Sequence, residues 1–182
     1  MGTLLVLLRG INVGGRNKIP MADLRDVFAD MGFSEPTTYI QSGNVVMGSR
    51  RANGPRIVTA IERALSAAFG YEARVVVRDL PQMRTVVRQI PEAWDVEDAS
   101  MRYNVIFTTH GLTAKQLVAQ VTPKPAVEEV HAGSQALYWS APFATLSKTA
   151  MIKLSAHPAY SELTVRNLRT TLTLLDLMRE RG

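Results

Sequence analysis

The amino-acid sequence predicts an α+β protein. Its first half has the strand–helix–strand–strand–helix–strand order of a ferredoxin-like fold, and this half is expected to pack with a second, related α+β half and C-terminal helices. Short runs of β-branched and other apolar residues alternate with segments whose apolar residues recur every three or four positions, and glycines follow several of these segments. A length of 182 residues suits one compact unit with two subdomains, 1–78 and 79–182.

In the first half, the run TLLVLL predicts a strand that is buried on both faces. Pro20 suits the start of the next helix, because its fixed φ and missing N–H are tolerated there, and Gly32 ends that helix. Ser42-Gly43 is a tight hairpin signal. The strands are expected at residues 3–8, 37–41, 44–47 and 73–78, and the helices at 20–31 and 57–69.

The second half follows a similar order of strand, helix, hairpin and helix, without a repeat at the level of residues. Thr113 is the expected N-cap of one helix, and a hairpin is expected around Gly133-Ser134. The strands are expected at 102–108, 127–131 and 135–140, and the helices at 79–90, 113–121, 146–155 and 165–179.

The composition excludes several classes of protein. The chain has no cysteine, which excludes disulfides and thiolate chemistry and fits a reducing compartment, so a cytoplasmic protein is expected. No apolar run reaches the roughly 18 residues of a membrane span, so no membrane partner is expected. The formal charge is +5, and the whole excess falls in residues 1–91, which favours anionic partners.

The ferredoxin-like order also predicts which loops are neighbours. The first and second strands should run parallel, with an antiparallel third strand between the first and the fourth. The loop at 9–18 and the hairpin at 41–44 should then emerge at the same end of the sheet. Arg50, Arg51 and Arg56 follow the third strand and should lie at the opposite end.

The loop RGINVGGRNK, residues 9–18, matches a phosphate-binding P-loop only in part. That motif needs Lys and Ser or Thr where this chain has Arg16 and Asn17, and its helix begins at once. These differences argue against a nucleoside triphosphatase. Two interpretations stay open: an anion-binding loop, or a connector in which Gly14-Gly15 provide positive φ and the asparagines form local turns.

Two further segments carry polar side chains at unexpected places. Gln41 and Asn44 flank the hairpin turn, where they either contact a ligand or cap backbone groups. In LTVRNLRTT, Thr164 is a plausible N-cap and places Arg166 in the first helical turn. The helix dipole disfavours a cation there unless an anion is bound, and the alternative is a salt bridge to Glu162.

Other templates for catalysis and binding fit poorly. The three histidines are far apart and match no metal spacing, so no metal site is expected and each is interpreted as a surface or loop residue. There is no G-x-S-x-G motif, and Ser42 is the only candidate nucleophile. The runs TLLVLL and NVVM hold no aromatic residue on which bases could stack, which argues against RNA recognition on the sheet.

The segments LLRGINVGGRNKIPMADLRDVFADMGF, TYIQSGNVV and TVRNLRTT resemble the bacterial domain-of-unknown-function family number 1697. The resemblance is specific over about the first 48 residues and returns at the third segment. It implies an α+β fold with ferredoxin-like halves and assigns no activity. Leu168 and Arg169 replace the usual Trp and Asn of the family. Because three polar segments mark the family, a shared site is favoured over three unrelated turns.

We therefore expect a small anionic or phosphate-bearing ligand between the halves, held by a nest of backbone N–H groups and by side-chain cations and amides. The ligand's identity, any cofactor, any reaction and the oligomeric state stay open. The alternatives are weak nucleic-acid binding through phosphates and a protein-interaction module without chemistry. The expected ligand-binding residues are Arg9, Gly10, Asn12, Gly14, Gly15, Lys18, Gln41, Ser42, Asn44, Arg166, Asn167 and Thr170.

Overall fold

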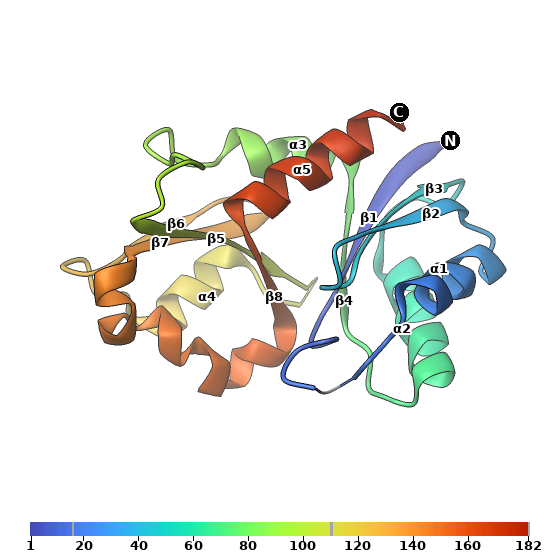
Figure 1. Cartoon of the computed structure of the whole chain (residues 1–182), viewed down its shortest axis with the longest axis horizontal. Helices are drawn as coiled ribbons and strands as arrows, with labels where there is room; N and C mark the ends of the chain where they lie inside the picture. The colour runs from blue at the N-terminus through green and yellow to red at the C-terminus, as the bar shows by residue number, and fades with distance from the viewer. Residues whose placement is uncertain (16, 110, 182) are drawn as a thin grey trace. The chain divides into compact units, whose positions relative to one another are not determined.

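A computed structural model describes residues 1–15, 17–109 and 111–181 (Figure 1). It is an α+β structure with two four-stranded antiparallel sheets. The chain divides into two compact units, here called unit 1 (Met1–Met83 with Leu174–Gly182) and unit 2 (Arg84–Thr173). The division follows Met83, whereas the sequence suggested a boundary after residue 78, and the end of the last helix belongs to unit 1.

The sheet of unit 1 has the strand order β2-β3-β1-β4, and every neighbouring pair is antiparallel. The first and second strands therefore run parallel, as predicted. The third strand lies between the first and the second, and not between the first and the fourth, because the short turn after β2 pairs β3 directly with β2. The elements are β1 (Gly2–Leu8), α1 (Met21–Asp30), β2 (Ser34–Tyr39), β3 (Asn44–Ser49), α2 (Pro55–Phe69) and β4 (Val75–Asp79).

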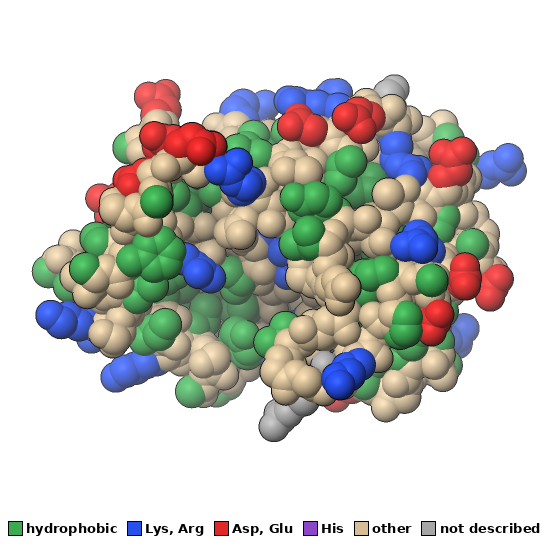
Figure 2. Space-filling model, viewed as in Figure 1, with side chains coloured by type: hydrophobic (Ala, Val, Ile, Leu, Met, Phe, Trp, Pro, Cys, Tyr) green, Lys and Arg blue, Asp and Glu red, His purple; other side chains and the backbone are tan. Residues whose placement is uncertain are grey.

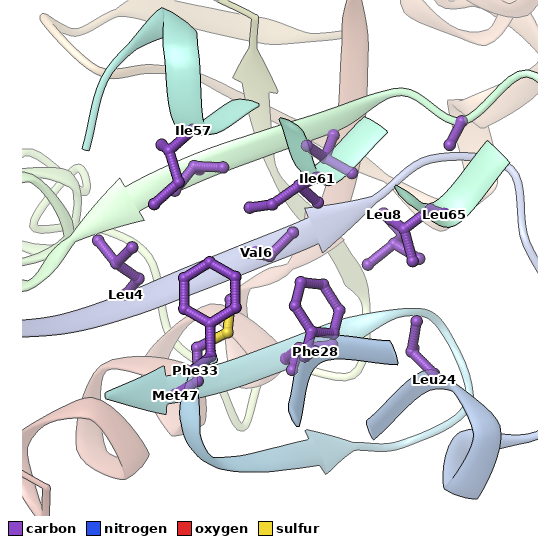
Figure 3. Close-up of a cluster of buried hydrophobic side chains, with 14 of the residues drawn as sticks. Leu4, Val6, Leu8, Leu24, Phe28, Phe33, Met47, Ile57, Ile61 and Leu65 are labelled. Atoms are coloured by element: carbon purple, nitrogen blue, oxygen red, sulfur yellow. The ribbon is translucent and has the colours of Figure 1, made fainter. Parts of the chain in front are cut away.

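The core of unit 1 lies between one face of this sheet and the two helices α1 and α2 (Figure 3). Alternate residues of β1 point into it, and helical spacing brings one stripe of each helix onto them. Each fully buried side chain of this kind contributes about 1.5–3 kcal/mol. On the other face of β1, Leu5 and Leu7 are also fully buried, which confirms a strand buried on both sides. The labelled core side chains are Leu4, Val6, Leu8, Leu24, Phe28, Phe33, Met47, Ile57, Ile61 and Leu65.

Unit 2 has a sheet of the same strand order, β6-β7-β5-β8, which is also antiparallel throughout. Thr113 caps α4 with a capping box to Gln116, which confirms the predicted N-cap. The helices and strands in the rest of the chain are α3 (Leu80–Arg88), β5 (Met101–Thr108), α4 (Ala114–Val121), β6 (Glu129–Ala132), β7 (Ala136–Pro142), β8 (Leu163–Asn167) and α5 (Leu168–Arg179). Of these, α3 begins in unit 1 and α5 ends in it.

Between β7 and β8 the sequence predicted a helix at 146–155, and the chain instead forms three 3₁₀ helices. They are η1 (Phe143–Lys148), η2 (Met151–Ala156) and η3 (Pro158–Glu162). The break has a local and a distant cause. The Thr149 hydroxyl bonds the Leu146 carbonyl, and the Glu128 carboxylate accepts the N–H groups of Ala150 and Met151, which an α-helix would direct to its own carbonyls.

The last helix begins at Leu168, three residues later than predicted. Residues 163–167 are extended because they pair with β5, Val165 opposite Ile106, and Leu163 is buried in the core of unit 2. Thr164 is therefore not the N-cap. Asn167 takes that role, since its Oδ1 accepts the N–H of Thr170 at 2.7 Å.

Candidate functional site

The loop at 9–18 is a small hairpin that its own asparagines close. The Asn12 N–H donates to the Asn17 carbonyl at 3.1 Å, and Asn17 Nδ2 donates to the Gly10 carbonyl at 3.0 Å. Gly14 and Gly15 have φ of 59° and 76°, left-handed values that favour glycine. This backbone conformation accounts for both glycines. Arg16, where the P-loop comparison needed a lysine, lies outside the described residues.

The Asn12 side chain joins this loop to the hairpin at residues 40–43 by hydrogen bonds. Its Nδ2 donates to the carbonyls of Ile19 and Gln41 at 3.0 and 2.9 Å, and its Oδ1 accepts the Ile19 N–H at 2.8 Å. The predicted proximity of the two segments is therefore confirmed. Gly2 pairs with Ser49 at the other end of β1. The predicted position of Arg50, Arg51 and Arg56, which follow β3, at the far end of the sheet is therefore confirmed too.

The hairpin residues have structural contacts of their own. Asn44 is fully buried, and its Nδ2 donates to the Tyr39 carbonyl and to Ser42 Oγ, both at 3.0 Å. These contacts match the capping alternative for Asn44. Gly43 has φ 73°, and a Cβ there would lie 2.7 Å from the Leu8 Cβ, so only glycine fits.

A hollow of about 460 Å³ lies beside the loop and the hairpin. Lys18 and Gln41, both exposed, are among its lining residues, and no carboxylate is among the described ones. Pro20 is the N-cap of α1 and offers no side-chain cap. The first N–H groups of α1 therefore lack intrahelical partners beside the hollow and favour negative charge. The lining residues are Asn12, Gly15, Lys18, Ile19, Pro20 and Gln41.

Ile40, in the hairpin turn, has φ 47° and a half-exposed side chain. A β-branched residue in the left-handed region is an outlier that costs on the order of 1–3 kcal/mol, and such strain concentrates at functional sites. Val13, in the neighbouring loop, is 65% exposed. The strained backbone of Ile40 was not predicted, because the second strand was expected to continue through it to residue 41.

The third polar segment, in unit 2, has a different geometry from the predicted one. Arg166 lies in β8 and is only 7% exposed. Its Nη1 donates to Thr164 Oγ1 and to the Val165 carbonyl, both at 2.8 Å, and burial lowers its pKa to about 10. The helix-dipole argument therefore does not apply to Arg166. Glu162, the alternative partner, accepts a hydrogen bond from Thr109 Oγ1 at 2.6 Å.

The junction between β4 and α3 in unit 1 repeats this arrangement. Arg78 is 5% exposed, and its Nη1 donates to the Val77 carbonyl at 2.9 Å. Burial lowers the pKa of Arg78 to about 10, although the negative charge of Asp79 acts to raise it. Asp79 Oδ1 accepts the Gln82 N–H at 2.9 Å, as Asn167 does for Thr170. VVVRDL and LTVRNL are thus equivalent junctions, a repeat that the sequence alone did not reveal.

Arg51 at the far end of the sheet and the faces of the central strands bear on the nucleic-acid alternative. Arg51 Nη2 donates to the Met31 carbonyl at 2.6 Å, and its guanidinium carbon lies 5.3 Å from the centre of the Phe33 ring. Leu5 and Val46, on the face of the sheet away from α1 and α2, are buried. The central strands therefore have no open face on which bases could stack.

In the part of the chain that the structure describes, no group of three or more His, Asp or Glu could hold a metal ion. No helix in that part is long and apolar enough to cross a bilayer. His131 is exposed, 3.8 Å from Glu129, and His157 Nδ1 accepts the Ala159 N–H. His110 lies outside the described residues.

Comparisons with known proteins agree with this fold. The family described as "Protein of unknown function (DUF1697)" matches residues 1–138. The structure is similar to that of the conserved bacterial protein SP0830 from Streptococcus pneumoniae, with 27% identity, a TM-score of 0.83 and coverage of 97% of this chain and 98% of that one. An unknown protein from Galdieria sulphuraria has 12% identity and a TM-score of 0.26 over 91% of this chain and 96% of its own, too low to support an argument. No curated protein matches.

Proposed function

We propose a ligand-binding role for this chain, which belongs to the DUF1697 family of proteins of unknown function. The ligand is a small anionic or phosphate-bearing molecule in the hollow beside the 9–18 loop. One observation carries the proposal: the Lys18 ammonium group and the Gln41 side chain line the same hollow, next to the uncapped start of α1, and no described carboxylate lines it.

In this proposal the residues have distinct roles. Lys18 supplies the charge, Gln41 hydrogen-bonds a polar edge of the ligand, and the first N–H groups of α1 donate hydrogen bonds to its negative charge. Asn12 holds the loop against the hairpin and so positions the other two. Arg9, half-buried at the start of the loop, adds to the positive potential.

The test uses inorganic phosphate and pyrophosphate with protein labelled with ¹⁵N at glycine. We expect saturable shifts of the Gly14 and Gly15 amide signals, and no shift for Gly48 in β3. Lys18→Gln should weaken binding about tenfold, the scale of one charge-assisted hydrogen bond. Arg50→Gln, a matched exposed change at the far end of the same sheet, should leave it unchanged. Equal loss in both variants would mean non-specific attraction and would refute the site.

A protein partner is the second candidate, and the exposed side chains of Val13 and Ile40 favour it. Their apolar surface would be covered by another macromolecule, whereas a small anion would leave it in water. Val13→Ser with Ile40→Asn should abolish a protein interaction and spare phosphate binding. Weak binding to nucleic acid is the remaining alternative, and its affinity would fall steeply with added salt.

We further propose that both units are ferredoxin-like and arose by duplication. The common strand order and the repeated Arg–Asx–Leu junction support this. An experimental structure in which β8 does not pair with β5 would contradict it.

A further inference from the structure

The two units differ in what covers the same face of their sheets. In unit 1 the segment between the third and fourth strands is α2, which places Ile57, Ile61 and Leu65 on the sheet in one stripe. In unit 2 the corresponding segment is η1–η3. A cavity of about 290 Å³ remains there, close to the 300 Å³ at which small-molecule sites begin. Figure 2 shows apolar side chains, with Lys and Arg side chains among them, over the part of the surface that η1 and η2 occupy in Figure 1.

The cavity is mainly apolar. Ile106, Trp139 and Val165 from the sheet line one side, and Leu146, Met151 and Leu154 from the 3₁₀ helices line another. Such a lining binds the hydrocarbon part of a ligand, because each buried CH₂ group gains about 0.8 kcal/mol on leaving water.

Two polar side chains of β5 interrupt this lining. Asn104 is 7% exposed, and its Oδ1 is buried without a hydrogen-bond partner among the described residues. Native structures rarely leave such an atom unsatisfied. Arg102 is exposed, and no hydrogen bond or ion pair joins its side chain to another described residue. Because side chains two residues apart on a strand share a face, Arg102 and Asn104 both line the cavity.

Glu128 fixes the shape of the cavity. Its carboxylate accepts four N–H groups: those of Lys124 at 2.8 Å, Ala150 at 2.7 Å and Met151 at 3.2 Å, and the Trp139 indole at 2.9 Å. Burial by itself raises the pKa of Glu128, and the four hydrogen bonds outweigh it and hold that pKa below its ordinary value. This carboxylate is thus charged at neutral pH, its oxygens accept hydrogen bonds within the wall, and Glu128 is not among the residues that line the cavity.

We infer that the cavity of unit 2 binds a small organic acid with an apolar body. The body lies against Ile106 and Trp139, the carboxylate pairs with the Arg102 guanidinium, and the Asn104 amide completes the contact. A carboxylate only accepts hydrogen bonds, so it is the NH₂ end of the Asn104 amide that donates to it. This site is separate from the hollow of unit 1 and does not depend on Lys18.

The experiment follows Trp139, which lines the cavity, in a Trp94→Phe background that removes the only other tryptophan. The probes are 4-phenylbutyrate and its uncharged counterpart, 4-phenylbutanol. We expect the acid to change the Trp139 emission saturably and to bind about tenfold more tightly than the alcohol. Arg102→Gln should remove that preference, and Arg84→Gln, an exposed arginine elsewhere in unit 2, should keep it.

A second variant tests the buried amide. Asn104→Leu has similar volume and removes the unsatisfied oxygen, so it should raise the melting temperature of the free protein and weaken binding of the acid. Equal binding of acid and alcohol, or no saturable change with the acid, would overturn the inference. Lys18→Gln should leave acid binding unchanged, which separates a failure here from a failure of the phosphate proposal.

Discussion

Unit 1 and unit 2 have the same strand order and the same Arg–Asx–Leu junction, and they differ in one connection. A helix of 15 residues crosses the sheet of unit 1, whereas three 3₁₀ helices cross the sheet of unit 2. A long α-helix brings a residue onto the same face every three to four positions and so closes the core. Short 3₁₀ segments change direction too often to do this, and the cavity in unit 2 follows.

The largest expected effect tests this difference in packing. Leu65 in α2 and Leu154 in η2 are both buried, and Leu154 borders the cavity. Leu65→Ala should lower the free energy of unfolding by about 3–5 kcal/mol, the range for a closed core. Leu154→Ala should cost clearly less, about 2 kcal/mol, because one side of Leu154 already lacks neighbours. Urea denaturation checks both, and equal losses would show that the unit 2 core is as closed as that of unit 1.

Glu128→Gln should have the next largest effect and lower the free energy of unfolding by about 2–3 kcal/mol. The NH₂ group of the amide would face N–H donors whose hydrogen bonds the carboxylate accepted. The change also has a pH signature. Since the folded pKa is depressed, the stabilisation is present above the unfolded value of about 4.3 and is lost as pH falls through the folded pKa. The wild-type advantage over the variant should therefore shrink as pH falls below about 4. An advantage that stays constant down to pH 3 would contradict this role.

The buried arginines form a matched pair across the units. Arg78→Gln and Arg166→Gln should each destabilise by about 1–2 kcal/mol, because each removes hydrogen bonds to buried acceptors. Denaturation of the two variants, with exposed Arg84→Gln as control, measures this. If Arg166→Gln lost as little stability as Arg84→Gln while Arg78→Gln lost more, the two junctions would not be equivalent.

The smallest expected effect is at the helix caps of the same junctions. Asp79→Ala and Asn167→Ala should each cost about 1 kcal/mol through the loss of a bond to a first-turn N–H. Thermal denaturation at neutral pH compares them. Thr164→Ala should not show a capping loss, because Thr164 lies within β8. Any loss for Thr164→Ala is expected to come from the hydrogen bond that Thr164 Oγ1 accepts from Arg166. No loss of stability for Asn167→Ala would contradict its role as the cap.

The sequence by itself determined the features that depend on neighbouring residues. The run TLLVLL specified a strand buried on both faces, the stripe of Ile57, Ile61 and Leu65 specified α2, and Thr113 with Gln116 specified a capped helix start. The closeness of the loop and the first hairpin also followed from the sequence, because the directions of the first two strands were enough to predict it.

Only the tertiary structure decided the features that depend on distant partners. TVRN is extended because β5 offers it backbone hydrogen bonds, which outweigh its local tendency to begin a helix. Residues 143–162 form 3₁₀ helices in part because Glu128, 22 positions before Ala150, accepts their N–H groups. Residues of these 3₁₀ helices and Asn104 of β5 line one cavity, which could therefore not be predicted from the sequence of β5 alone.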